Sequence, residues 1–398
     1  MTSADALSYG IAFAVAAAIT FITTPIVRRM AIRVGAVVGP EERRVHTVPT
    51  PTLGGAAMFV AFVVAMAVSS QLSGFDNVFR GSSEPLAVLL GATVIFAVGL
   101  IDDVREVSAP AKVAGMVLAG GVLSLLGVTM FYFRIPFSDR DFVSLSPDLA
   151  PLVGIIWVAG MANAINLIDG LDGLAAGIVA IAAGAFFLYT TRLSNGILPQ
   201  DSIGPLVAAV TCGLCVGFLP HNFHPAKIFM GDGGALMLGL LMASSTMVVG
   251  GRVDDQFSGQ TYFFFAPLVI PLVILGLPIL DTVFAVVRRA TRHAKLTEAD
   301  KEHLHHRLMR MGHGQRRSVL ILWAWTAVLS AVVLFPTYTN RGNAIVPAVM
   351  AGMGVALYTL FHPGLRRNGR VPEVPPAPPS PAPTNGRRGD LRPPARLP

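Results

Sequence analysis

The chain has 398 residues, of which 53% are hydrophobic and only 13% are charged, and its formal net charge at pH 7 is +7. Soluble domains carry about 25% charged residues, so this composition excludes an ordinary soluble enzyme and predicts a membrane protein. In such a chain, positive charge reports orientation in the bilayer and attraction to anionic lipid, and we expect no nucleic-acid partner.

Apolar stretches of spanning length recur along the chain and predict an all-α polytopic membrane protein with about eleven transmembrane helices. The stretches lie near residues 7–24, 53–70, 85–101, 109–128, 149–168, 173–191, 203–221, 233–249, 262–285, 319–336 and 344–361. No basic segment precedes the first stretch and further spans follow it, so we interpret it as a membrane helix and not as a cleavable signal peptide.

Lys and Arg residues gather in alternate loops, and the positive-inside rule then places the N-terminus outside and the C-terminus in the cytoplasm. We expect residues 1–365 to form one integral-membrane domain and the basic, proline-rich residues 366–398 to form a disordered cytoplasmic tail. The ninth stretch contains Pro267, Pro271 and Pro278, which predict a bent helix.

Two adjacent acids, Asp102 and Asp103, end the third stretch, and Lys112 follows in the next one. Acids at a helix C-terminus oppose the helix dipole, so they need a cation or a basic partner. The alternative is a pair that merely caps a solvent loop.

The segment 163–174 reads NAINLIDGLDGL and follows the fifth stretch into solvent. Its amides and acids, Asn163, Asn166, Asp169 and Asp172, offer oxygen ligands at three-residue spacing. Such ligands suit Mg²⁺, which usually also takes oxygens from a substrate phosphate. The alternative is a helix that ends in solvated acids and a glycine stop.

The segment from His221 to Gly239 places Asn222, Lys227, Phe229 and Asp232 at the start of the eighth stretch. Phe229 offers a ring for stacking on a base, and the start of a helix offers free N–H groups to an anion. Three glycines frame the acid and are expected to open the backbone around it: Gly231, Gly233 and Gly234.

A basic loop after the ninth stretch contains His303, His305, His306 and Arg307. No cysteine or acid completes a tetrahedral zinc set at standard spacing, so anion recognition is favoured over zinc binding or a solvated basic face.

These polar clusters lie at the ends of spans on one side of the membrane. A transporter would instead place its ionisable groups near the midplane.

Taken together, the Asp102–Asp103 pair, the NAINLIDGLDGL segment, the Asn222–Asp232 segment with its FMGD and the HLHHRL of residues 303–308 resemble the polyprenyl-phosphate N-acetylhexosamine-1-phosphate transferases. The resemblance covers about residues 5–365. The HLHHRL motif is similar to that of the branch that initiates teichoic acid, O-antigen and arabinogalactan-linker synthesis, and in particular to its actinobacterial members, which use decaprenyl phosphate.

The resemblance implies transfer of GlcNAc-1-phosphate from UDP-GlcNAc to polyprenyl phosphate, with release of UMP and with Mg²⁺, or alternatively Mn²⁺, as cofactor. It implies an inner (plasma) membrane enzyme with a cytoplasmic active site, a lipid groove beside the bent ninth helix, and a homodimer. Two alternatives stay open: the same chemistry on another UDP-N-acetylhexosamine, and a non-catalytic transporter or lipid-binding scaffold.

The resemblance also implies roles for individual residues. Asp232 and Asn166 match metal ligands. Asp102, Asp103, Asp232 and Lys112 match catalytic positions around the metal and the phosphates. The substrate-binding positions are Asn163, Asp169, Asp172, Asn222, Phe229, His303, His305, His306 and Arg307. Among these, Asp172 matches a uracil contact, Asn222 and Phe229 the nucleoside pocket, and the residues from His303 to Arg307 a sugar–phosphate loop.

Overall fold

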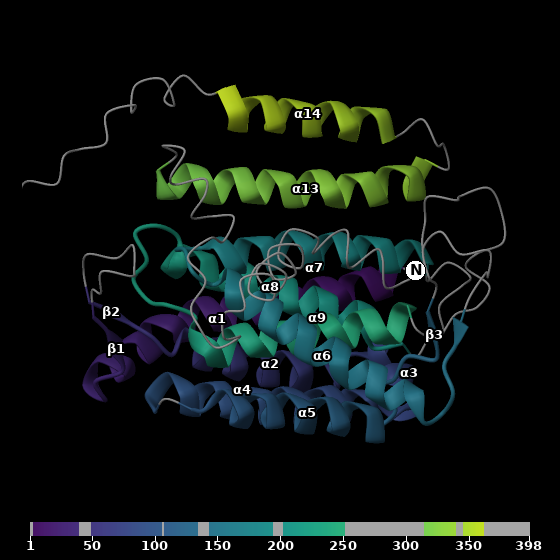
Figure 1. Ribbon diagram of the computed structural model, residues 1–398. Helices are drawn as coiled ribbons and strands as arrows, with labels where there is room; N and C mark the ends of the chain where they lie inside the picture. The colour runs from purple at the N-terminus through teal and green to yellow at the C-terminus, as the bar shows by residue number, and fades with distance from the viewer. Residues whose placement is uncertain are drawn as a thin grey trace, which may run out of the picture.

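A computed structural model describes residues 3–39, 49–105, 107–133, 143–193, 202–250, 314–339 and 345–361. Its elements, labelled as in Figure 1, are α1 (Ser3–Arg33), β1 (Val37–Val38), β2 (Thr50–Pro51), α2 (Gly54–Ser69), the 3-10 turn η1 (Ser73–Phe75), α3 (Asp76–Gly81), α4 (Glu84–Val104), α5 (Ala109–Leu125), β3 (Tyr132–Phe133), β4 (Val143–Ser144), α6 (Leu149–Ile168), α7 (Leu174–Leu193), α8 (Gly204–Asn222), α9 (Gly231–Gly250), α13 (Gln315–Thr339) and α14 (Ile345–Phe361).

The prediction of an all-α polytopic membrane protein is confirmed. Seven described helices are long and apolar enough to span a membrane, or eight if α2 and the η1–α3 segment, bent by 93°, form one span. The count of eleven and the orientation of the termini stay predictions. The ninth stretch with its prolines and the tail 366–398 lie outside the described residues, whereas the other expected stretches each coincide with a helix.

Local sequence signals set several helix starts. Pro85, Pro110 and Pro205 each lie in the first turn of a helix, α4, α5 and α8 respectively. Proline is tolerated there because the first N–H groups have no partner within the helix. The described residues also contain two short antiparallel ribbons that were not predicted, β1 with β2 and β3 with β4.

Helix α9 is the central element of the bundle, because 94% of its most apolar 18-residue segment is buried inside the protein. It packs against α2, α4, α6 and α8, while α13 packs on α7 and α14. Figure 1 shows α4 and α5 on one side of the molecule, α13 and α14 on the other, and α7, α8 and α9 between them. A helix that is apolar on every face belongs in a protein interior, so α9 forms the core on which the site is built.

Glycines allow the start of α9 to lie very close to its neighbours. A Cβ on Gly99 of α4 would lie 2.5 Å from Gly233 Cα, and a Cβ on Gly55 of α2 would lie 2.5 Å from Gly234 Cα. Side chains at these positions would force the helices apart. The glycines beside Asp232 therefore serve helix packing, as small residues commonly do between membrane helices.

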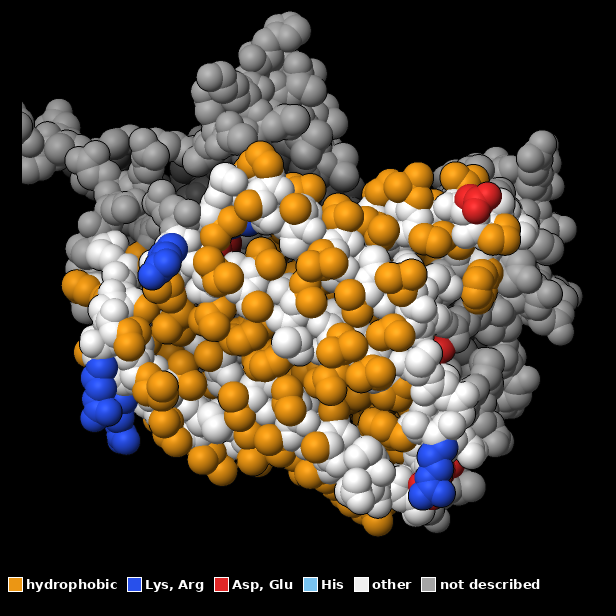
Figure 2. Space-filling view, turned by 90° about the horizontal axis from the view of Figure 1, so that it is seen from below, with side chains coloured by type: hydrophobic (Ala, Val, Ile, Leu, Met, Phe, Trp, Pro, Cys, Tyr) orange, Lys and Arg blue, Asp and Glu red, His pale blue; other side chains and the backbone are white. Residues whose placement is uncertain are grey.

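The outer surface fits a lipid environment. Figure 2 shows a face covered mainly by hydrophobic side chains, with Lys and Arg side chains at its edges. Leu90 on α4 and Leu118 on α5 are among the large apolar side chains that are exposed. A soluble monomer rarely exposes a continuous apolar surface of this extent, so this face is one that the bilayer would cover.

Candidate active site

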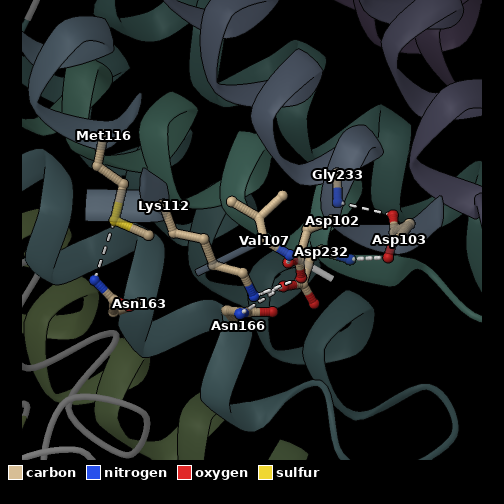
Figure 3. Close-up of polar contacts among 9 residues, drawn as sticks. All are labelled: Asp102, Asp103, Val107, Lys112, Met116, Asn163, Asn166, Asp232 and Gly233. Atoms are coloured by element: carbon tan, nitrogen blue, oxygen red, sulfur yellow. Dashed lines mark hydrogen bonds and ion pairs between the residues drawn. The ribbon is translucent and has the colours of Figure 1, made fainter. Parts of the chain in front are cut away.

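The predicted acidic residues meet at one end of the helix bundle, where α4 ends, α5 and α9 begin and α6 ends (Figure 3). Asp102 and Asp103 lie in the last turn of α4, Lys112 lies in the first turns of α5, and Asp232 lies in the first turn of α9. Asn166 lies in the last turn of α6, and Asp169 is the C-cap residue of the same helix.

Asp103 caps helix α9. The backbone N–H groups of Asp232 and Gly233 donate to Asp103 Oδ1 and Oδ2, at 2.8 and 3.1 Å. Gly231 has a φ of 75°, and a Cβ there would lie 2.5 Å from Asp103 Oδ2. Two of the N–H groups expected to form an anion site at the start of this helix are therefore bound by the protein's own carboxylate, and the glycine at position 231 allows that carboxylate to approach.

Lys112 joins the other two acids. Its Nζ lies 2.5 Å from Asp102 Oδ2 and 2.6 Å from Asp232 Oδ2 (Figure 3). The basic partner predicted for the Asp102–Asp103 pair is thus present. Asp102 also closes a loop, because the N–H of Val107 donates to its Oδ1 at 2.8 Å. The alternative of a pair that only caps a solvent loop is accordingly wrong.

The two amides on α6 have different surroundings. Asn166 Nδ2 lies 3.5 Å from Asp232 Oδ2, so the two predicted metal ligands are adjacent. Asn163, one turn earlier, donates to Ala159 O at 2.8 Å and lies 3.2 Å from Met116 Sδ. The structure therefore brings Asn166 into the acidic cluster and bonds Asn163 to its own helix and to α5.

Asp169 adds a further acid to this cluster. Burial raises its pKa well above the ordinary value, and the charges of Asp232, Asp103 and Asp172 add to the increase. Within the described ranges, Asp102, Asp103, Asp169 and Asp232 outnumber the one ammonium at the site, Lys112. Asp102 and Asp232 both face this single ammonium, and the side-chain amide of Asn166 lies beside Asp232, so the cluster fits a hard divalent cation.

A fully formed metal cage is nevertheless absent: the residues that the structure describes contain no group of three or more His, Cys, Asp or Glu side chains arranged to hold an ion. Mg²⁺ usually keeps several waters and is bound through one or two carboxylates plus substrate phosphates, so it does not require such a cage.

Asp172 lies at a second polar site, beside the α8–α9 connection. It is buried, and its Oδ2 accepts hydrogen bonds from His224 Nδ1 at 2.7 Å and from the Ala226 N–H at 3.0 Å. The alternative of solvated acids at a helix end is therefore wrong for this residue. Sequence reasoning missed His224, although it stands within the HNFHPAKIFMGD segment that was singled out.

Asn222 and Phe229 tie this connection to the rest of the protein. Asn222 is buried, donates to Ile228 O and accepts from the Gly173 N–H, each at 3.0 Å. The Phe229 N–H donates to Pro51 O, and its carbonyl accepts from the Gly54 N–H, each at 2.9 Å. These hydrogen bonds fix the connection at both ends and so define the position of the start of α9. His303, His305, His306 and Arg307 lie outside the described residues.

Comparison with known proteins relates this chain to membrane glycosyl-phosphate transferases. The sequence profile of glycosyl transferase family 4 matches residues 85–250, the part that holds the acidic cluster and Asp172. The chain is 38% identical over 357 residues, 88% of each chain, to decaprenyl-phosphate N-acetylglucosaminephosphotransferase of Mycobacterium tuberculosis. It is 38% identical over 328 residues, 81% of this chain and 84% of the relative, to the probable undecaprenyl-phosphate N-acetylglucosaminyl 1-phosphate transferase of Bacillus subtilis.

A more distant relative is phospho-N-acetylmuramoyl-pentapeptide-transferase of Mycobacterium bovis, which is 30% identical over 387 residues, 87% of this chain and 96% of the relative. The matches thus extend well beyond the profile, over most of the membrane helices. The chain belongs to glycosyl transferase family 4.

Proposed function

We propose that this protein transfers GlcNAc-1-phosphate from UDP-GlcNAc to a polyprenyl phosphate in the membrane. The observation that carries the proposal is the cluster in which Lys112 bridges Asp102 and Asp232 at the end of the apolar bundle. A charged site at this position suits a reaction between a water-soluble nucleotide sugar and a lipid phosphate. The names of the relatives from M. tuberculosis and B. subtilis support both the sugar and the lipid class.

The reaction is a displacement at phosphorus. An oxygen of the lipid phosphate bonds to the sugar-bearing β-phosphorus of UDP-GlcNAc, the bond from that phosphorus to the bridging oxygen breaks, and UMP leaves with the bond's electron pair. The products are polyprenyl-diphosphate-GlcNAc and UMP. A phosphate monoester has its second pKa near 6, so the lipid phosphate is mostly a dianion at neutral pH and needs little help from a general base.

Repulsion between the two phosphorylated substrates is then the main barrier that the protein must lower. Lys112 supplies a positive charge at the site, and Asp103 fixes the start of α9 and with it the position of Asp232. Asp232 and Asn166 would hold Mg²⁺, or Mn²⁺ in its place, which when bound neutralises phosphate charge. Asp102 and Asp103 are each held by hydrogen bonds within the protein, so we favour direct attack over a covalent aspartyl intermediate.

The nucleotide is assigned to the second polar site. Asp172, Asn222 and Phe229 lie on or beside the α8–α9 connection, which joins directly to the helix that carries Asp232. A uridine held there would present its diphosphate toward the acidic cluster. The sugar–phosphate contacts would come from His303, His305, His306 and Arg307, as the resemblance implies.

The setting is proposed with the reaction. We place the active site on the cytoplasmic face of the inner (plasma) membrane, with the N-terminus outside, because basic residues gather in the loops on that side. The product would be the first membrane-bound intermediate of a cell-wall polysaccharide or linker. Residues 366–398 are not expected to take part in catalysis, and the protein is expected to form a homodimer.

A second candidate is the same chemistry on another UDP-N-acetylhexosamine, which the similarity to the pentapeptide transferase of M. bovis favours over unrelated chemistry. Purified protein with Mg²⁺, polyprenyl phosphate and a panel of radiolabelled UDP-sugars separates the two. Label in a lipid product from UDP-GlcNAc alone supports the proposal. Label from another UDP-sugar in preference supports the second candidate, and no lipid-linked label from any of them would contradict both.

A further inference from the structure

A cleft of about 340 Å³ lies between α13 and α14, outside the site described above. Its wall is formed by Arg317, Leu320 and Ala324 of α13 and by Ala351, Gly354 and Val355 of α14. Helix α13 packs on α7 and α14, whereas the acidic cluster is built from α4, α5, α6 and α9. Figure 1 shows α13 and α14 on the opposite side of the molecule from α4 and α5.

Small residues on α14 create the cleft. Gly352 faces α13, because a Cβ there would lie 3.3 Å from Val328 and 3.8 Å from Trp325. Gly354 does not contact α13, because a Cβ at this position would have no atom within 4 Å. The two helices are therefore in contact at one glycine and leave an open space at the other. A larger side chain at position 354 would fill that space without a backbone clash.

The cleft has one charged end. Arg317 lies in the first turn of α13, which contains no acid, and in the described parts of the chain no carboxylate forms an ion pair with it. Farther along α13, the ring centroid of Trp323 lies 5.7 Å from that of Phe223, the residue that follows the end of α8. Arg317 is thus at the end of the bundle that also carries the acidic cluster, the level at which lipid headgroups lie.

We propose that this cleft binds one anionic membrane phospholipid, with its phosphate on Arg317 and one acyl chain along Leu320, Ala324 and Gly354. A guanidinium group presents paired donors that match a phosphate, and the rest of the wall is apolar. The occupant is not the acceptor of the reaction. The acceptor's phosphate must approach Lys112 on α5, and Figure 1 shows that α7, α8 and α9 lie between α5 and the helices α13 and α14 that line the cleft.

The test uses full-length protein in detergent, stripped of lipid and titrated with phosphatidylglycerol or phosphatidylcholine, with lipid adducts counted by native mass spectrometry. Wild type should retain one phosphatidylglycerol in preference to phosphatidylcholine. Arg317→Gln should weaken that adduct roughly fivefold, the effect of about 1 kcal/mol per basic residue at an anionic surface. Arg316→Gln is the matched control, because Arg316 is exposed on the same turn but does not line the cleft.

A second pair of variants tests the apolar part. Gly354→Leu should abolish the retained adduct, whereas Met353→Leu, a change at an adjacent exposed position, should not. Each variant is first checked for an unchanged circular dichroism spectrum, and if Gly354→Leu does not fold, the two arginine variants still decide. The proposal does not depend on the transferase activity, which can be measured separately on the same preparations.

Three results would overturn the proposal. The first is equal retention of phosphatidylglycerol and phosphatidylcholine, or equal retention by Arg317→Gln and Arg316→Gln. The second is a change in the monomer–dimer ratio of Gly354→Leu with lipid retention unaltered, which would make the cleft an interface between copies of the chain. The third is displacement of phosphatidylglycerol by polyprenyl phosphate together with a raised KM for that acceptor in Arg317→Gln, which would make the cleft an acceptor site.

Discussion

Lys112 Nζ and Asp232 Oδ2 lie 2.6 Å apart although the two residues are separated by 120 positions in the sequence. The same ammonium lies 2.5 Å from Asp102 Oδ2, so one positive charge is shared between two helices that each present an acid. Because these acids would also attract a bound metal ion, Lys112 and the ion compete for the same carboxylates.

Asp232→Asn should reduce turnover at least about a hundredfold while the protein remains folded in detergent. An amide cannot replace the charge that a carboxylate gives to a hard-cation site. The measurement is UMP release at saturating Mg²⁺, with the melting temperature as the check on folding. Activity like that of wild type at ordinary Mg²⁺ would exclude Asp232 as a metal ligand.

Lys112→Met should slow turnover and yet bind a divalent cation more tightly, because it removes an ammonium that lies against Asp102 and Asp232. We expect the affinity for Mn²⁺, measured by electron paramagnetic resonance without substrates, to increase by roughly tenfold. Lys112→Arg keeps the charge and is the control, for which the affinity should stay near that of wild type. Weaker Mn²⁺ binding by Lys112→Met would show that Lys112 does not compete with the ion.

Asp103→Ala should lower stability, because the Asp232 and Gly233 N–H groups at the start of α9 lose their acceptor. Loss of a helix N-cap acceptor costs about 1–2 kcal/mol. Turnover should fall as well, since the same contact positions Asp232, whereas Asp103→Asn keeps one acceptor oxygen and should lose less stability. Unaltered melting of Asp103→Ala would contradict the capping role.

The stability of the protein should depend on pH through Asp169. Its pKa in the folded protein is raised well above the ordinary value, first by burial and then by the neighbouring acids. A raised pKa means that the folded state binds the proton more tightly. The resulting stabilisation is complete below the unfolded pKa of about 3.9 and is lost as the pH rises through the raised value.

Asp169→Asn carries no such dependence. With chelator present, its melting temperature relative to wild type should therefore increase as the pH rises from the unfolded pKa of about 3.9 through the raised pKa of Asp169. A melting difference that is constant over this range would mean that the pKa of Asp169 is not raised in the folded protein.

The sequence predicted the helical membrane fold and the basic partner of Asp102 and Asp103 because both depend on local pattern and on simple charge balance. It could not predict what the glycines near Asp232 do. Glycine permits ligand approach and helix contact equally, and only the packing of Gly233 on Gly99 and of Gly234 on Gly55 distinguishes the two.

Long-range polar contacts were also beyond the sequence. The GLDG spacing around Asp172 is the same whether the acid is solvated or buried, and its partner His224 lies 52 positions away. Likewise, Asn163 and Asn166 are equivalent in the motif. They differ in the structure because one helical turn separates the residue beside Asp232 from the residue beside Met116.

The most direct test of the account is a single-turnover measurement of UMP release from UDP-GlcNAc by the wild-type enzyme, with and without polyprenyl phosphate. Direct attack by the lipid phosphate at the Lys112–Asp232 site predicts UMP only when the lipid is present, in equal amount to polyprenyl-diphosphate-GlcNAc. A burst of UMP without lipid, stoichiometric with enzyme, would instead indicate a covalent intermediate on the enzyme and would contradict this mechanism.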